Sequence, residues 1–183
     1  QAWEARVLIE AAGVNPTGVA KQVTARIDKI SAADLAWLAS VLTYGVARDR
    51  FLMDTLPKLN YADIATCRLL IKQAYSDPAG VALAALRTLP SLTDGELAQV
   101  AGDLTSVEIR ERILLGAVPL LTQVTLPGTG DIILQAATKR EELAALLFAK
   151  YRGLQGLELA SLVGRFEDGR VRDLLIAQGI RFL

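Results

Sequence analysis

A three-residue phrase, an acidic residue followed by Leu or Ile and then Ala, recurs along this chain. It stands at Asp34-Leu35-Ala36, Asp63-Ile64-Ala65, Glu96-Leu97-Ala98 and Glu158-Leu159-Ala160, with a weaker copy at Asp131-Ile132-Ile133. Successive copies are 29, 33, 35 and 27 residues apart. An aliphatic residue lies four positions before each strong copy: Ile30, Leu59, Leu92 and Leu154. A period near 30 residues indicates helical hairpins, which bury their apolar stripes only by stacking on one another.

The phrase has the character of a helix start. The polar residues Ser31, Asn60, Thr93 and Gln155 lie where an N-cap is expected. The acidic side chain then falls in the first turn, where the helix dipole favours negative charge. Ser31 and Asp34 also have the spacing of a capping box.

Each unit continues through a break into a second apolar helix. We place the breaks near Gly45–Asp49, Asp77–Gly80, Thr105–Ser106, Thr138–Lys139 and Asp168–Gly169. The predicted fold is all-α, a right-handed α-solenoid of about five to six helical hairpins in a single domain, residues 1–183. Its predicted parts are a degenerate leading hairpin, 1–30, broken around Pro16, and repeats at 30–59, 60–91, 92–125, 126–153 and 154–183.

The chain is apolar for its size, with 52% hydrophobic residues and a mean hydropathy of +0.33. The longest uncharged run, residues 113–130, is interrupted by Pro119 and Pro127, so we expect no membrane span. Apolar surface covered by a partner is the better interpretation. The last residues, 179–183, lack the polar face of a terminal cap, so we expect another subunit or further chain to cover one end.

The residues that most catalytic sites require are missing. There is no histidine, and the single cysteine, Cys67, excludes a thiolate zinc site and is predicted to be buried. The adjacent acids Glu141–Glu142 and Glu167–Asp168 are interpreted as solvated helix starts. We therefore predict no catalytic, cofactor-binding or metal-binding residue, and a chain that is not an enzyme.

Pro127-Gly128-Thr129-Gly130-Asp131 is the best candidate for a phosphate-binding loop. It lacks the Gly-Lys-Ser/Thr ending of a P-loop, and no strand precedes it. We interpret it as a turn in which Thr129 caps the next helix.

Charge argues against a nucleic-acid partner. The chain carries 20 basic and 20 acidic residues, whereas phosphate neutralisation favours a positive excess. The best RNA-contact candidates are Arg165, Arg170, Arg172 and Arg181. Nearby acids, Glu158, Glu167, Asp168 and Asp173, are expected to pair with them at helical spacing.

Two tryptophans, Trp3 and Trp37, are present. Trp37 could anchor a partner, because aromatic side chains are favoured at binding hot spots. Packing between repeats is the more common role and the one that we favour.

The stretch Ile30-Ser31-Ala32-Ala33-Asp34-Leu35-Ala36-Trp37-Leu38-Ala39 resembles the repeat opening of octotricopeptide and related RAP-associated helical-repeat proteins of mitochondria and chloroplasts. Leu154-Gln155-Gly156-Leu157-Glu158-Leu159-Ala160-Ser161-Leu162 resembles it too. The resemblance covers residues 30–183 and is poorest at 125–150. Pentatricopeptide repeats are similar in period, but their characteristic positions do not align. A small pentatricopeptide-like accessory subunit of the ATP synthase of some protists is similar in size and style.

This resemblance implies an organellar protein that either binds RNA or serves as a structural subunit of a large complex. The chain is shorter, more neutral and poorer in aromatic residues than the RNA-binding members, and it contains no RAP domain. We therefore expect a scaffold or adaptor subunit that binds another protein within a mitochondrial complex such as the ATP synthase or the mitoribosome. RNA binding is the alternative. The mitochondrial matrix is the expected location, with the chloroplast as the alternative, and the start at Gln1 without Met fits removal of a presequence.

Overall fold

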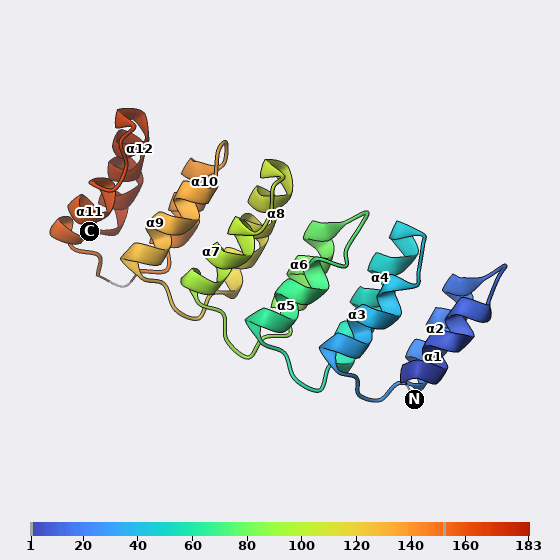
Figure 1. Cartoon of the computed structure of the whole chain (residues 1–183). Helices are drawn as coiled ribbons and strands as arrows, with labels where there is room; N and C mark the ends of the chain where they lie inside the picture. The colour runs from blue at the N-terminus through green and yellow to red at the C-terminus, as the bar shows by residue number, and fades with distance from the viewer. Residues whose placement is uncertain (1, 152) are drawn as a thin grey trace. The chain divides into compact units, whose positions relative to one another are not determined.

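The computed structural model describes residues 2–151 and 153–183, and these residues form helices and their connections, with no strand among them. The prediction of an all-α protein is confirmed (Figure 1). The α-helices are α1 (Ala2–Ala11), α2 (Pro16–Arg26), α3 (Ala32–Ser40), α4 (Gly45–Thr55), α5 (Ile64–Ile71), α6 (Pro78–Leu86), α7 (Asp94–Gly102), α8 (Val107–Ala117), α9 (Leu126–Gln135), α10 (Arg140–Phe148), α11 (Gly156–Val163) and α12 (Gly169–Gly179). Short 3-10 helices, η1 (Leu56–Lys58), η2 (Val118–Leu120) and η3 (Ile180–Phe182), extend α4, α8 and α12.

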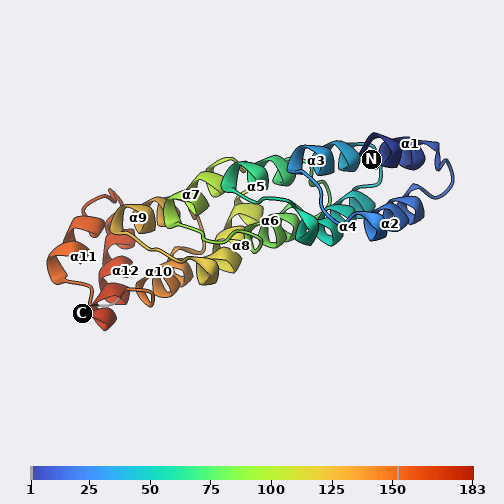
Figure 2. The same ribbon diagram turned by 90° about the horizontal axis from the view of Figure 1, so that it is seen from below.

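The chain divides into two compact units, unit 1 (Gln1–Pro90) and unit 2 (Ser91–Leu183). In unit 1 the hairpins are α1–α2, α3–α4 and α5–α6, and in unit 2 they are α7–α8, α9–α10 and α11–α12. We call the first helix of each hairpin the A helix and the second the B helix. Within each unit the A helices pack on one another in one layer and the B helices in a second layer, as Figure 2 shows from below. A single solenoid over residues 1–183 stays a prediction.

Most of the predicted helix starts are confirmed. Ser31 is the N-cap of α3, and its hydroxyl accepts the N–H of Asp34 at 3.1 Å. Thr93 and Glu96 form a capping box at α7. Gln155 is the N-cap residue of α11, where its N–H donates to the carboxylate of Glu158.

The prediction for Asn60 is wrong. Asp63, which we placed in the first turn, is itself the N-cap of α5, and its carboxylate accepts the N–H of Thr66 at 2.7 Å. An Asp carboxylate caps as well as an Asn does, so the helix begins three residues later than expected. The predicted breaks at Gly45–Asp49 and Asp77–Gly80 are also misplaced, because α4 already begins at Gly45 and α6 at Pro78.

The interpretation of residues 127–131 as a turn is wrong as well. These residues lie inside α9, which Thr125 caps through the N–H of Gly128 at 3.1 Å. Thr129 caps nothing: it is fully buried, and its hydroxyl hydrogen-bonds that of Tyr151 at 2.8 Å. The weaker copy of the phrase, at Asp131, therefore lies within a helix and not at its start.

The structure also explains the uneven spacing of the phrase. Equivalent helices of alternate hairpins begin 62 residues apart: α3, α7 and α11 begin at 32, 94 and 156, and α4, α8 and α12 at 45, 107 and 169. The odd hairpins follow the same rule, with α1, α5 and α9 beginning at 2, 64 and 126. The chain is thus a repeat of two unlike hairpins, and residues 62 apart occupy equivalent positions. We call such residues counterparts.

The interior of both units is aliphatic. Leu35 and its counterpart Leu97 are both fully buried, as are Leu52 and Leu114. Cys67 is fully buried, as predicted, and its Sγ lies 3.4 Å from the carbonyl oxygen of Ala85.

Candidate protein-binding face

Three positions on each A helix of unit 1 face solvent, and they are spaced by four and then three residues. Such spacing places them on one side of a helix. They are Trp3, Val7 and Glu10 of α1, Ala33, Trp37 and Ser40 of α3, and Ala65 and Leu69 of α5 with Lys72, the residue that follows α5. Because α3 packs against both α1 and α5, these nine residues form one surface, which we call the outer face.

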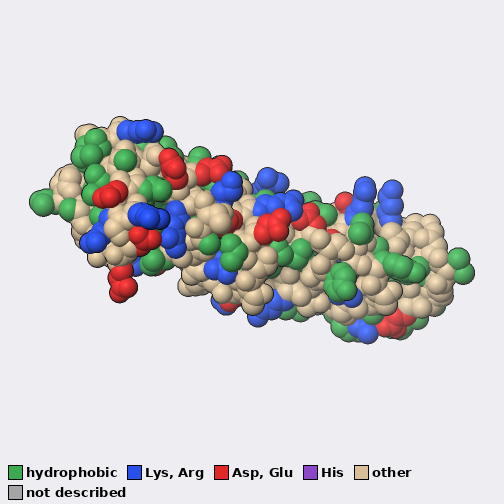
Figure 3. All heavy atoms as spheres, turned by 90° about the horizontal axis from the view of Figure 1, so that it is seen from above, with side chains coloured by type: hydrophobic (Ala, Val, Ile, Leu, Met, Phe, Trp, Pro, Cys, Tyr) green, Lys and Arg blue, Asp and Glu red, His purple; other side chains and the backbone are tan. Residues whose placement is uncertain are grey.

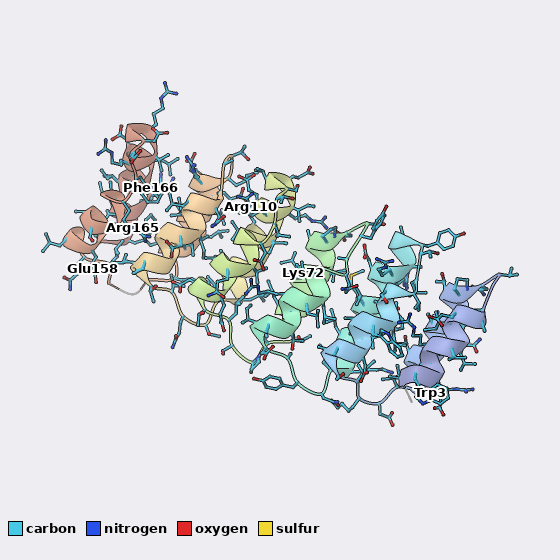
Figure 4. All side chains as sticks on the ribbon, in the orientation of Figure 1. Trp3, Lys72, Arg110, Glu158, Arg165 and Phe166 are labelled. Carbon is cyan, nitrogen blue, oxygen red and sulfur yellow. The ribbon has the colours of Figure 1, made fainter. Side chains whose placement is uncertain are left out.

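Large apolar side chains occupy the middle of the outer face. Trp3, at the beginning of α1 (Figure 4), is 62% exposed and Val7 51%. Trp37 and Leu69 are 40% and 38% exposed. The guanidinium of Arg6 lies 4.4 Å from the centroid of the Trp37 ring, a cation–π distance. Trp37 thus does link two hairpins, as expected, but much of its ring remains open to a partner.

Two exposed tyrosines lie in the loops between A and B helices of unit 1. Tyr44 precedes α4 and Tyr75 precedes α6, and they are 70% and 73% exposed. The Tyr75 ring packs over Gly45, where a Cβ would lie 2.3 Å from its Cδ1 atom. We call residues 41–44 and 72–77 the tyrosine loops. Figure 3 looks onto this edge, where hydrophobic side chains are exposed among acidic and basic ones.

A buried carboxylate holds the second tyrosine loop. Asp49 of α4 accepts the N–H groups of Tyr75, Ser76 and Asp77 at 2.8, 2.7 and 2.6 Å, and it is only 2% exposed. Hydrogen bonds to a charged acceptor are among the strongest in proteins. Asp49 therefore fixes the backbone from which Tyr75 projects.

Unit 2 contains the same device. Glu111, the counterpart of Asp49, accepts the N–H groups of Ala137, Thr138 and Lys139 and the Thr138 hydroxyl. Burial raises the pKa of Glu111, but the hydrogen bonds from Thr138 and from the backbone of Lys139 and Ala137 outweigh it and lower the pKa to about 2. Glu111 is a structural carboxylate that stays charged near neutral pH.

Two further groups with a shifted pKa, Asp63 and Tyr151, also make structural hydrogen bonds. The N–H and hydroxyl groups of Thr66 lower the pKa of Asp63, the cap of α5. Burial raises the pKa of Tyr151 to about 12, against the effect of its hydrogen bond with Thr129. The acids Glu141 and Glu142 are exposed in the first turn of α10, and Asp168 is the N-cap of α12.

Over residues 2–151 and 153–183, no group of three or more His, Cys, Asp or Glu side chains is placed to hold a metal ion. Among the helices of this part of the chain, none is both long enough and apolar enough to cross a membrane.

The proposed pairing within the basic group is wrong for Arg165. Its guanidinium reaches α9 (Figure 4), where it contacts Asp131 and the carbonyl oxygen of Pro127, both at 2.6 Å, in place of one of the predicted acids. Arg170 and Arg172 are exposed on α12, and Arg181 donates to Gln178 at 3.3 Å. Arg165 is thus an inter-hairpin contact, which leaves fewer of these arginines free for phosphate.

The sequence interpretation considered Trp37 but missed the tyrosine loops and the rest of the outer face. The available signal was the 62-residue period. Under this period Trp37 is equivalent to Gln99 and Ser161, and Tyr75 is equivalent to Ala137. Comparison of the chain with protein-family models, with curated proteins and with solved structures finds no match.

Proposed function

We propose that this chain is a non-catalytic scaffold subunit that binds another protein through unit 1. The observation that carries the proposal is the distribution of exposed aromatic side chains. Trp3, Trp37, Tyr44, Tyr61 and Tyr75 are exposed, and all lie in unit 1. The described aromatic residues of unit 2, by contrast, are buried or half-buried.

Exposed tryptophan and tyrosine are costly to leave in water and are the residues that most often anchor protein interfaces. The outer face adds Val7 and Leu69 to its two tryptophans, so a partner would bury an apolar centre. The last of the three outer-face positions in each hairpin would supply polar contacts at the rim; these residues are Glu10, Ser40 and Lys72.

Charge separates this proposal from the alternative, RNA binding. Residues 1–90 carry 10 basic and 8 acidic residues, which gives little of the positive excess that RNA-binding surfaces use. Aromatic side chains and arginine can nevertheless stack on unpaired bases, and Trp37 with Arg6 is the pair that favours this alternative.

The resemblance to octotricopeptide-type repeats places the scaffold, in this proposal, in the mitochondrial matrix within a complex such as the ATP synthase or the mitoribosome. No chemistry is assigned to it, and no cofactor is needed.

The test is affinity purification of the tagged chain from mitochondrial extract, with and without ribonuclease, followed by mass spectrometry. The proposal expects one set of protein subunits that survives ribonuclease and is lost in the double variant Trp37→Gln, Leu69→Asp. The control is Leu134→Asp, which changes an exposed apolar residue of α9 in unit 2. Partners that vanish with ribonuclease, and RNA affinity that falls steeply with salt, would instead establish RNA binding.

A further inference from the structure

The loops between the A and B helices of unit 1 carry large apolar side chains that face solvent. These three loops lie along one edge of the unit (Figure 1). Val14, between α1 and α2, is fully exposed, and Tyr44, Val46 and Tyr75 are 70%, 73% and 73% exposed. The Tyr75 ring packs over Gly45, the residue between Tyr44 and Val46, so three of the four side chains adjoin one another. We call Val14, Tyr44, Val46 and Tyr75 the loop edge.

The exposure of the loop edge follows from its place in the hairpin. Ser76 and Thr138, the counterparts of Val14, are exposed in hairpins that pack against a preceding one. Val14 is therefore exposed because of its position in the loop, whatever packs beside α1. The counterparts of the loop edge in unit 2 are small, polar or charged: Ser106, Glu108, Ala137, Thr138, Asp168 and Arg170. Apolar side chains at these positions are thus a feature of unit 1.

The loops of unit 1 are also free of charge, and a cation borders each of them. Residues 11–20, 35–47 and 73–76 contain no Asp, Glu, Lys or Arg, and Lys21, Arg48 and Lys72 flank them. Lys21 and Lys72 are exposed. Arg48 is held beside its loop, because its Nε donates to the carbonyl oxygen of Leu42 at 2.8 Å.

The acidic residues beside the same loops are engaged within the molecule. Glu10 binds Arg6 at 2.6 Å, and Asp77 caps α6 with its carboxylate. Asp49 is buried and holds the second tyrosine loop, and Asp34 lies at the other end of α3. The charge that this edge presents to a partner is therefore mainly positive.

This combination matches the surface of a membrane. Tyrosine, with an apolar ring and a polar hydroxyl, is enriched where membranes meet water, and cations beside it attract anionic headgroups. Side chains on separate loop tips can each enter fluid lipid, whereas the anchors of protein interfaces lie together in packed pockets. The A–B loops of unit 2 carry exposed acids among their cations, including Glu108, Glu167 and Asp168, and anionic lipid would repel these acids.

We propose that the loop edge of unit 1 binds the surface of an anionic membrane, with its two valines and two tyrosine rings inserted among the headgroups. The contact is peripheral and requires no helix that crosses the bilayer. It goes beyond the proposed function, because the loop edge shares no residue with the outer face. Each proposal therefore holds or fails without the other.

Flotation of the purified 183-residue chain with lipid vesicles tests the proposal. One set of vesicles is phosphatidylcholine alone, and the other contains about one third phosphatidylglycerol, to which the chain should bind at least about tenfold more tightly. Binding should weaken at high salt without vanishing, because salt screens the cations but leaves the apolar insertion.

A variant without the apolar side chains separates insertion from charge. Val14→Thr, Tyr44→Ser and Tyr75→Ala give three loop-edge positions the residues of unit 2 and leave the net charge unchanged. The triple variant should bind anionic vesicles at least about tenfold more weakly, since less apolar surface leaves water. Its circular dichroism should match that of the wild type. Trp37→Gln with Leu69→Asp, which alters the outer face, is the control and should bind vesicles as the wild type does.

Insertion itself can be followed with a polarity-sensitive fluorophore. Val14→Cys carries the label, and Cys67 is fully buried and so protected from labelling. The emission should shift to the blue on anionic vesicles, whereas a label on Thr138→Cys, the counterpart in unit 2, should not shift.

Three outcomes would overturn the proposal. The first is a wild-type chain that floats with neither set of vesicles. The second is a triple variant that binds as tightly as the wild type, which would show adsorption by charge alone. The third is a triple variant that loses ribonuclease-resistant protein partners and no vesicle binding, which would assign the loop edge to a protein interface.

Discussion

Units 1 and 2 share one frame and differ in what they present to solvent. Several buried leucines recur at equivalent positions, as Leu35 and Leu97 or Leu52 and Leu114 do. Exposed counterparts differ in chemical type: Trp37 becomes Gln99, and Leu69 becomes Asp131. Packing explains the first set, since an interior tolerates few changes of volume. It does not explain large apolar side chains on the surface of only one unit, and this contrast directs the search for a partner to unit 1.

The tyrosine loops show how such a difference is accommodated. Unit 1 has Gly45 under the Tyr75 ring, and the counterparts of this pair in unit 2 are Val107 and Ala137. The loop backbone is held in the same way in both, by Asp49 in one and by Glu111 in the other. The loop with the surface tyrosine and the loop without it are thus both held by a buried carboxylate, an aspartate in unit 1 and a glutamate in unit 2.

Substitutions of the buried leucines in the shared interior should cause the largest loss of stability. Leu97→Asp and Leu35→Asp each place an unpaired charge at a fully buried position and should lose about 3–5 kcal/mol of unfolding free energy. Thermal melts followed by circular dichroism measure the loss. Gln99→Asp, on the exposed side of α7, is the control and should melt as the wild type does. An unchanged melt for either leucine variant would show that the two positions are not equivalent.

The loop carboxylates should have the next largest effect. Glu111→Gln and Asp49→Asn each remove the charge that accepts three N–H groups, and each should cost about 2 kcal/mol in chemical denaturation. Asp173→Asn, at the exposed third position, should leave the stability of the dilute chain unchanged.

The contribution of Glu111 should depend on pH. Its pKa is about 2 in the folded protein against 4.5 for a free carboxyl group. A lowered folded pKa means that the unfolded chain binds the proton more readily, so the stabilisation is fully present above pH 4.5 and is lost as the pH falls towards 2. The stability difference between wild type and Glu111→Gln should shrink over that interval, and a difference that grew with acid would contradict the assignment.

Because the Tyr75 ring fills the space beside Gly45, substitutions at these two positions should have coupled effects on the free energy of unfolding. Gly45→Val forces the Tyr75 ring aside, whereas the double variant with Tyr75→Ala reproduces the pair found in unit 2. A double-mutant cycle should give about 1 kcal/mol of coupling. The same cycle with Tyr61→Ala, a tyrosine outside both loops, should give none, and equal coupling in the two cycles would show that the effect is not local.

The smallest expected effect is on the outer face itself. Trp37→Gln removes the cation–π contact with Arg6 and should cost no more than about 1 kcal/mol. A small loss of stability together with a complete loss of partner binding would mark Trp37 as a binding residue. A loss of several kcal/mol would mark it as part of the core.

The fold was more predictable from the sequence than the candidate site. The helices can be predicted from local chemistry, such as the capping box of Thr93 and Glu96. The helical spacing of aliphatic residues after each cap supports the same prediction. Where two residues could serve as the cap, as at Asn60 and Asp63, local chemistry was ambiguous and tertiary packing decided. The buried carboxylates of Asp49 and Glu111 bind loops about 26 positions further along the chain. The sequence did not predict these contacts, because a charged side chain on its own indicates only a solvated surface. Hairpin spacing alone did not predict the outer face, because it does not distinguish these positions on three helices from core positions.

The most direct test of the account is partner capture by two surface variants, one altered in each unit. The first replaces the outer-face residues of unit 1, Trp3→Ala, Val7→Asp, Trp37→Gln and Leu69→Asp; the second replaces exposed apolar residues on the A helices of unit 2, Leu134→Asp and Leu157→Asp. The account predicts that the first variant keeps its circular dichroism and loses its ribonuclease-resistant partners, while the second keeps both. Equal capture by the two variants, or loss only in the second, would contradict the assignment of binding to unit 1.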